Sequence, residues 1–181
     1  MLLSLVASAG VIFLGVLEGI VVAIVLSILL FFHRNWWPHG VVLGRVPGRE
    51  GWHSESGVDG FTERPDIVVF RWEAPLFFAN AGIFADQVRE LVEERQPAWV
   101  VLQCEAITDI DVTAAGMLDR LDQELNAKGV HLAFVELRTR LYGLVHDYGL
   151  FATLDRDHFY TSIDEALVDI ARTPGPEHPE P

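Results

Sequence analysis

The first 32 residues of the chain carry no lysine or arginine and only one acid, Glu18. The run from Leu2 to Phe32 is otherwise almost continuously apolar, and about 20 apolar residues are enough for a helix to cross a bilayer. This run lacks the basic start and the small-residue cleavage site of a secretory signal peptide. The sequence therefore predicts a transmembrane segment over residues 1–35, built as one long helix or as two shorter ones.

Two glycines and the single acid interrupt this apolar segment. Gly15 and Gly19 have the G-x-x-x-G spacing that lets two membrane helices approach closely, although glycine is also common in membrane helices in general. A lone carboxyl group is costly in hydrocarbon, so we expect Glu18 to face other helices or a water-filled cavity. Gly15, Glu18 and Gly19 are therefore candidate helix-packing residues, with a transport role for Glu18 as the alternative.

Basic residues follow the apolar run only on its C-terminal side, beginning with Arg34. Positive charge gathers on the cytoplasmic side of membrane segments. Trp36 and Trp37 suit the interfacial aromatic belt, and Pro38 ends a helix. We therefore expect a protein of the cell membrane whose C-terminal domain lies in the cytoplasm.

The rest of the chain alternates between strand and helix patterns. We expect strands at 41–46, 67–72, 99–102 and 130–135, and a loop at 47–65. The expected helices begin at residues with capping chemistry, which are Asn80, Asp111, Thr139 and Ser162. Such alternation predicts an α/β domain with a mixed sheet.

Charge and cysteine content exclude several classes of function. The chain has 26 acidic and 13 basic residues, a net charge of −13, which disfavours nucleic-acid binding because that affinity comes from Lys and Arg on phosphates. Cys104 is the only cysteine, so no intrachain disulfide can form. Its apolar neighbours favour a buried structural thiol over a nucleophile.

The stretch from Ala106 to Met117 is the strongest candidate for chemistry. Asp109, Asp111 and Thr113 match the D-x-D-x-T pattern of haloacid-dehalogenase-type phosphatases, which use the first Asp as a nucleophile and hold magnesium. That chemistry also needs a downstream lysine and an acidic pair. The one lysine, Lys128, lies too near the motif, so a magnesium-dependent phosphatase is a remote alternative and we expect no enzyme.

A binding switch is the second interpretation of this stretch. Asp111 is expected to cap a helix whose first turn contains Thr113, where free backbone N–H groups favour an anion. A phosphoryl group on Thr113 would add about −1.5 to −2 charges beside two carboxylates. The third interpretation is that Thr113 simply suits a first helical turn.

No cofactor or metal is expected. The pairs His146–Asp147 and Asp157–His158 lack a recognised ligand spacing, and residues 44–51 lack the lysine and the helix of a phosphate-binding loop.

Taken together, these segments resemble the SulP (sulfate permease, SLC26-like) family of anion transporters. The stretch 15–30 is similar to its last transmembrane segment, and 42–48 with 69–81 resembles the opening of its cytoplasmic STAS domain. The stretch 107–118 resembles the loop and helix start that STAS domains share with anti-sigma-factor antagonists. In the antagonists this loop reads Asp-Ser-Ser-Gly and carries a phosphorylated serine. Here it reads Asp111-Val112-Thr113-Ala114.

The resemblance implies a STAS-type mixed sheet with helices packed mainly on one side, preceded by the transmembrane segment. It implies four regions: the membrane segment at 1–35, a juxtamembrane strand and loop at 36–66, the STAS core at 67–172 and a disordered tail at 173–181. The implied partner-binding loop consists of Asp109, Asp111, Val112, Thr113, Ala114 and Gly116, with Thr113 as the candidate switch.

The function implied is that of the C-terminal part of a sulfate or anion permease, with the STAS domain as a regulatory or protein-interaction module. The implied partners are the rest of the permease bundle, the lipid bilayer and a cytoplasmic protein, with a homodimer as a further expectation. A stand-alone membrane-tethered regulator that resembles the anti-sigma-factor antagonists is the alternative.

Overall fold

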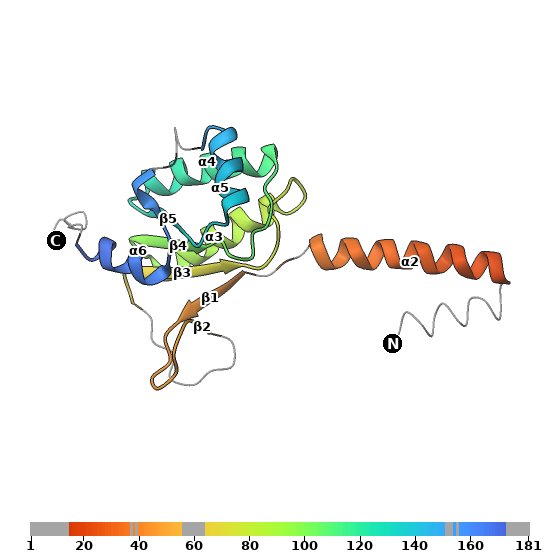
Figure 1. Cartoon of the computed structure of the whole chain (residues 1–181), viewed down its shortest axis with the longest axis horizontal. Coiled ribbons are helices and arrows are strands. Elements are labelled where there is room, and N and C mark those ends of the chain that lie inside the picture. Colours follow the sequence, from red (N-terminus) through yellow and green to blue (C-terminus); the bar gives the residue numbers. More distant parts are fainter. Residues whose placement is uncertain are drawn as a thin grey trace. The chain divides into compact units, whose positions relative to one another are not determined.

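The computed structural model describes residues 15–36, 38, 40–55, 64–150, 154 and 156–172. The chain divides into two compact units, Met1–Pro38 and His39–Pro181 (Figure 1). The expected disordered tail at 173–181 and the first fourteen residues of the expected membrane segment lie outside the described residues.

In the first unit the described residues form one helix, α2, which spans Val16–Trp36. Large apolar side chains are exposed all along it: Val16, Leu17, Ile20, Val21, Ile24, Val25, Ile28, Leu29 and Leu30. Within the described ranges, no helix has both the length and the apolar content that crossing a bilayer demands.

The second unit is built on one six-stranded mixed sheet with the order β2-β1-β3-β4-β5-β6. Its strands are β1 (Gly40–Gly44), β2 (His53–Ser54), β3 (Ile67–Trp72), β4 (Trp99–Gln103), β5 (His131–Val135) and β6 (Phe159–Tyr160). Both neighbours of β1, the strands β2 and β3, run antiparallel to it. The strands β3, β4, β5 and β6 run parallel to one another. This confirms the predicted α/β class.

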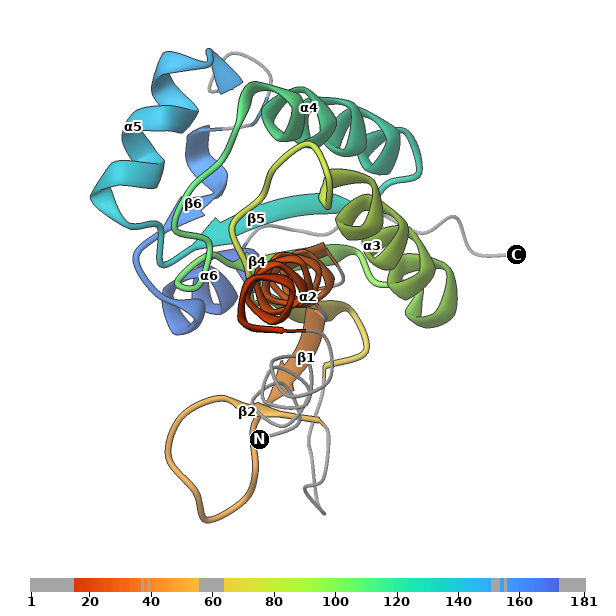
Figure 2. The same cartoon turned by 90° about the vertical axis from the view of Figure 1, so that its right-hand side faces the viewer.

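Helices cover the two faces of the sheet unequally (Figures 1 and 2). One face carries α3 (Ala81–Arg95), α4 (Val112–Ala127) and α5 (Thr139–Asp147). Among the described residues, the helix on the other face is α6 (Ile163–Ile170). Side chains alternate along β3, so Val68 and Phe70 join the first core while Ile67 and Val69 join the second. Both faces are therefore apolar, and β4 is buried along its whole length.

Two short strands differ from the sequence expectation. The segment 47–65, expected as a loop, contains β2, and the expected α5–α6 connection contains β6 after a short 3-10 turn, η2 (Arg156–His158). Each strand has two residues, too few to show an alternating pattern. They form because the exposed edges of β1 and β5 offer backbone partners.

Asn80 also differs in detail. It occupies the cap position of α3, but its side chain makes no cap hydrogen bond. Its Oδ1 instead accepts from Phe77 N at 2.9 Å, and its Nδ2 donates to Pro75 O at 2.8 Å. The fully buried amide therefore stabilises the loop before α3 rather than the helix.

Candidate functional site

Two loops meet at the carboxyl ends of β3 and β4 to form the candidate site. Leu76 and Ile110 form an isolated parallel bridge between the loops. Leu76 N donates to Asp109 O at 3.0 Å, and Asp111 N donates to Leu76 O at 3.2 Å. The predicted loop 109–111 is thus held to a segment more than thirty positions earlier in the chain.

Asp111 fastens the start of α4. Its Oδ1 accepts from Ala114 N at 2.8 Å, which confirms the predicted helix cap. Its Oδ2 accepts from Phe78 N at 2.8 Å. One carboxylate therefore caps the helix and fixes the neighbouring loop at the same time.

Asp109 has different partners. Its Oδ1 accepts from Ile110 N at 3.0 Å, and its Oδ2 accepts from Arg140 of α5 at 3.0 Å. Arg140 is 74% exposed and Asp109 is 50% exposed. The nucleophile that the phosphatase alternative requires is therefore an ion-paired acceptor, and Asp111 is a structural cap.

Beside this ion pair, the two loops expose apolar side chains and a hydroxyl. Phe78 is 68% exposed and Val112 is 69% exposed, and Thr113 is exposed in the first turn of α4. Ala114, which the resemblance places in the partner-binding loop, is fully buried. Ala114 therefore supports the loop by packing and cannot present its side chain to a partner.

Phe78 was not among the residues expected from the sequence. It lies in the apolar stretch Ala74–Phe78, where nothing in the pattern distinguishes the exposed ring from the buried Leu76. Its position follows from the backbone contact with Asp111, which is a tertiary contact.

A shallow pocket of about 250 Å³ adjoins this surface. Val112, Gly116 and Asp119 of α4 line one side, and Tyr148 and Leu150 beyond α5 line the other. Gly116, the last predicted loop residue, therefore lines this pocket.

Cys104, the single thiol, is buried, and its Sγ donates to Leu102 O at 3.4 Å. Burial raises the pKa of this thiol far above its ordinary value. A thiol that stays protonated is a poor nucleophile, in line with the structural role predicted for it.

The candidate packing residues of the first unit lie at the start of α2. Gly15 precedes the helix with a φ of 105°, and its carbonyl accepts from Gly19 N at 2.9 Å. Glu18 is exposed in the first turn. Their role in helix packing stays a prediction.

The histidine pairs considered in the sequence do not gather further ligands among the described residues. His146 Nδ1 lies 3.3 Å from Asp147 Oδ1. No group of three or more metal-ligating side chains is found in the described ranges.

Curated relatives of this chain are sulfate transporters. A probable sulfate transporter of Mycobacterium tuberculosis is 34% identical over 169 residues, which cover 92% of this chain and 30% of the relative. The chloroplastic sulfate transporter 4.1 of Arabidopsis thaliana is 24% identical over 90% of this chain and 25% of its own length. The chain thus spans less than a third of the relatives it matches.

Solved structures share the fold. The murine Slc26a9 anion transporter in its inward-facing state aligns with a TM-score of 0.82 at 20% identity, covering 94% of this chain and 28% of that one. The STAS domain of a Vibrio cholerae SulP transporter aligns with a TM-score of 0.52 at 20% identity, over 63% of this chain and 88% of its own. An anti-sigma factor antagonist from Thermotoga maritima aligns with a TM-score of 0.51 at 19% identity, over 59% and 89%.

The STAS domain profile matches residues 61–166, more than half of the chain. That range contains β3 to β6, the helices between them and the loop braced by Asp111. The resemblance seen in the sequence is therefore confirmed, and the chain belongs to the STAS domain family.

Proposed function

We propose that this chain is the C-terminal part of a SulP-type sulfate or anion permease, in which the STAS domain acts as a regulatory module. The observation that supports this is the alignment of 92% of the chain, apolar segment included, with a probable sulfate transporter. Because the chain covers only 30% of that relative, transport itself requires helices encoded outside these residues. Sulfate uptake should depend on those helices and change when residues 39–172 are deleted from the complete permease.

The apolar run 2–32 is proposed to lie in the membrane, with residues from His39 onward in the cytoplasm. The run has no basic residue, whereas Arg34, Arg45 and Arg49 follow it. In this setting Gly15 and Gly19 would pack against another permease helix, and Glu18 would face the bundle and not lipid.

The cytoplasmic location can be tested by thiol labelling. Glu50→Cys in a Cys104→Ala background places one thiol on an exposed loop. A membrane-impermeant maleimide should label it only after intact cells are permeabilised. Equal labelling of intact cells would place this loop outside and contradict the proposal.

The surface formed by Phe78, Val112 and Thr113 is proposed to dock a protein partner. Exposed apolar side chains beside a capped helix start form a contact patch, and the Asp111 brace holds both loops in place before any partner arrives. Preorganisation of this kind lowers the ordering cost of binding.

Photo-crosslinking from this surface tests the docking proposal. A benzoylphenylalanine at position 112 should crosslink a partner in native membranes. The same group at Val168, 52% exposed on the opposite face of the sheet, serves as the matched control. Identical products from both positions, or no product from 112, would contradict the proposal.

The identity of the product separates the alternatives. A permease helix indicates regulation within the transporter, a separate cytoplasmic protein indicates a tethered regulator, and a second copy of this chain indicates a homodimer.

Thr113 is proposed as the switch of this surface. A phosphoryl group there would meet the N-terminal end of α4, which favours anions, but would also lie near the carboxylates of Asp109 and Asp111. Thr113→Glu should change the crosslinking yield from position 112, whereas Thr113→Val should not. Equal yields for the two variants would contradict a charge-based switch at this residue.

A further inference from the structure

The face of the sheet opposite α3, α4 and α5 is only partly covered. The short helix α6 packs mainly on β4, β5 and β6. A cavity of about 240 Å³ remains between α6 and strands β1 and β3. The residues that line it are distant in sequence from the loop that contains Asp111.

The floor of this cavity is apolar. It is formed by side chains of β1 and β3, namely Leu43, Ile67 and Val69, each of which is at most 4% exposed. Leu167 of α6 closes one side and is partly buried against the same core. Side chains that border an empty space lose dispersion contacts on that side, so an apolar occupant would gain them.

The polar side chains that line the cavity belong to Arg45, Trp52, Arg64 and Asp164. Arg45 forms an ion pair with Asp164 of α6, and its guanidinium lies 5.2 Å from the centre of the Trp52 ring. Arg64 also lines the cavity. Arg64 is itself paired with Asp66 through Nε and Nη2. Two aspartates therefore balance the two arginines, and recognition of an anion rests on the N–H groups that these pairs do not engage.

Trp52 also borders the cavity. Its indole Nε1 is buried and has no hydrogen-bond partner among the described residues. A buried N–H donor without an acceptor is costly, and native proteins almost always satisfy such groups. Arg45 adds further donors, since a guanidinium has five N–H hydrogens and its pairing with Asp164 engages only Nη2. The cavity therefore offers donors to an oxygen-rich anion.

We propose that this cavity binds a small carboxylate with an apolar body, held by Arg45 and the Trp52 N–H at its head and by the β1–β3 floor along its body. At about 30 Å³ for each water-sized group, the volume suits about eight non-hydrogen atoms. That is the size of a six-carbon monocarboxylate. This ligand site is separate from the docking surface at Val112, so either proposal can fail without the other.

The test is an NMR titration of the full chain in nanodiscs of uncharged phospholipid, with hexanoate as the probe. The indole N–H resonance of Trp52 is assigned by its loss in Trp52→Phe. Hexanoate should shift this resonance saturably, with a dissociation constant of about 1 mM or lower. Hexanamide keeps the apolar body without the charge, and acetate keeps the charge without the body, so both should bind at least about tenfold more weakly.

Substitutions test where hexanoate binds. Arg45→Gln should weaken hexanoate binding about tenfold or more, because it removes a charged donor. Arg49→Gln changes an exposed arginine four residues later that is not among those lining the cavity, and it should leave binding unchanged. Leu167→Trp should abolish binding by filling the cavity, while the indole resonances of the native tryptophans in the core, Trp72 and Trp99, stay dispersed and show that the domain is folded.

Four results would overturn the proposal. The first is the absence of a saturable shift with hexanoate. The second is equal binding of hexanamide, which would mark an apolar void without anion recognition. The third is an equal effect of Arg45→Gln and Arg49→Gln. A Trp52 resonance that responds to protein concentration and not to hexanoate would also reject the site, and would show that another chain covers the cavity.

Discussion

Phe78 N donates a hydrogen bond of 2.8 Å to Oδ2 of Asp111, a residue 33 positions later in the chain. The other oxygen of the same carboxylate accepts from Ala114 N at 2.8 Å and caps α4. A single side chain thus couples the loop after β3 to the start of the helix after β4. The exposed surface of the candidate site depends on this coupling.

Asp111→Ala should lower the free energy of unfolding by about 1–2 kcal/mol, the usual cost of losing an N-cap. The measurement is urea denaturation followed by near-ultraviolet circular dichroism. Asp119→Ala removes a carboxylate of the same helix that accepts a hydrogen bond from Gln123 and does not cap the helix, so it should change the value by no more than about 0.5 kcal/mol. Equal losses for both variants would show that the cap contributes nothing specific.

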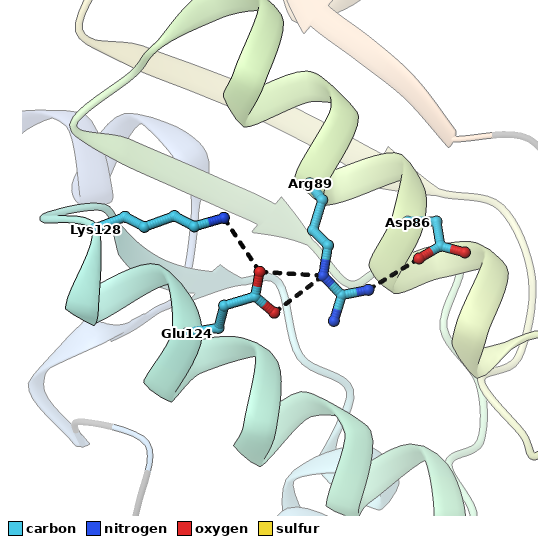
Figure 3. Close-up of polar contacts among 4 residues, drawn as sticks. All are labelled: Asp86, Arg89, Glu124 and Lys128. Atoms are coloured by element: carbon cyan, nitrogen blue, oxygen red, sulfur yellow. Dashed lines mark hydrogen bonds and ion pairs between the residues drawn. The ribbon is translucent and has the colours of Figure 1, made fainter.

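An ion-pair network joins α3 to α4 (Figure 3). Arg89 Nε lies 3.0 Å from Glu124 Oε2, and Lys128 Nζ lies 3.2 Å from Glu124 Oε1. The hydrogen bond from Arg89 is the main cause that lowers the pKa of Glu124, and it also raises the pKa of Arg89. A carboxyl whose folded-state pKa is lowered stabilises the fold at neutral pH, and this contribution is lost as acid protonates it.

Glu124→Gln should therefore destabilise the domain at pH 7 by about 0.5 kcal/mol, since the pair is about one-third exposed to solvent. The difference from wild type should shrink below about pH 4, where glutamates become protonated. Urea denaturation at pH 7 and at pH 3.5 measures it. Glu90→Gln, at an exposed position of α3, is the control, and a difference that does not depend on pH would exclude the ionic origin.

Tyr160 should respond to alkali. Burial is the main cause that raises its pKa to about 12, with help from its hydrogen bond of 3.0 Å to Asp169 Oδ2. A group whose folded-state pKa is raised stabilises the fold below its unfolded pKa, and this stability is lost as pH rises through the folded-state pKa. The loss should fall between about pH 10 and pH 12.

Absorbance at 295 nm follows tyrosine ionisation directly. Tyr160→Phe should remove the step with the highest pKa and make stability less sensitive to alkaline pH. Tyr142→Phe removes a tyrosine that is 50% exposed and should leave that step in place. Loss of the same step in both variants would contradict the assignment to Tyr160.

Gly40 opens β1 where no larger residue fits. A Cβ added there would come within 1.9 Å of the Phe70 ring. Gly40→Ala should therefore destabilise the domain by about 1–3 kcal/mol through overpacking. Gly82 in α3 has open space around the same position, so Gly82→Ala should be neutral or stabilising by up to about 1 kcal/mol. Urea denaturation of both variants checks the contrast, and an equal response would contradict it.

Much of the fold was predictable because its signals are local. The apolar run of β4, the cap at Asp111 and the capped start of α6 at Ser162 appear in consecutive residues. The strands β2 and β6 were not predictable, because two residues carry no period and pair only where a neighbouring strand offers an open edge.

The candidate site was likewise predictable only in part from the sequence. The spacing of Asp109, Asp111 and Thr113 was visible in the sequence, and so was the likeness to a loop of STAS domains. The burial of Ala114 and the exposure of Phe78 were not visible, because burial depends on what packs from other elements.

The sequence by itself determined the class of this protein: an apolar segment followed by an acidic α/β domain whose elements and caps follow from neighbouring residues. Only the tertiary structure decided which groups meet. The contact of Phe78 with Asp111, the pairing of Arg89 with Glu124 and the cavity bounded by Arg45 and Trp52 join residues from separate elements. Such contacts arise when the sheet brings distant segments together, and no local pattern in the chain encodes them.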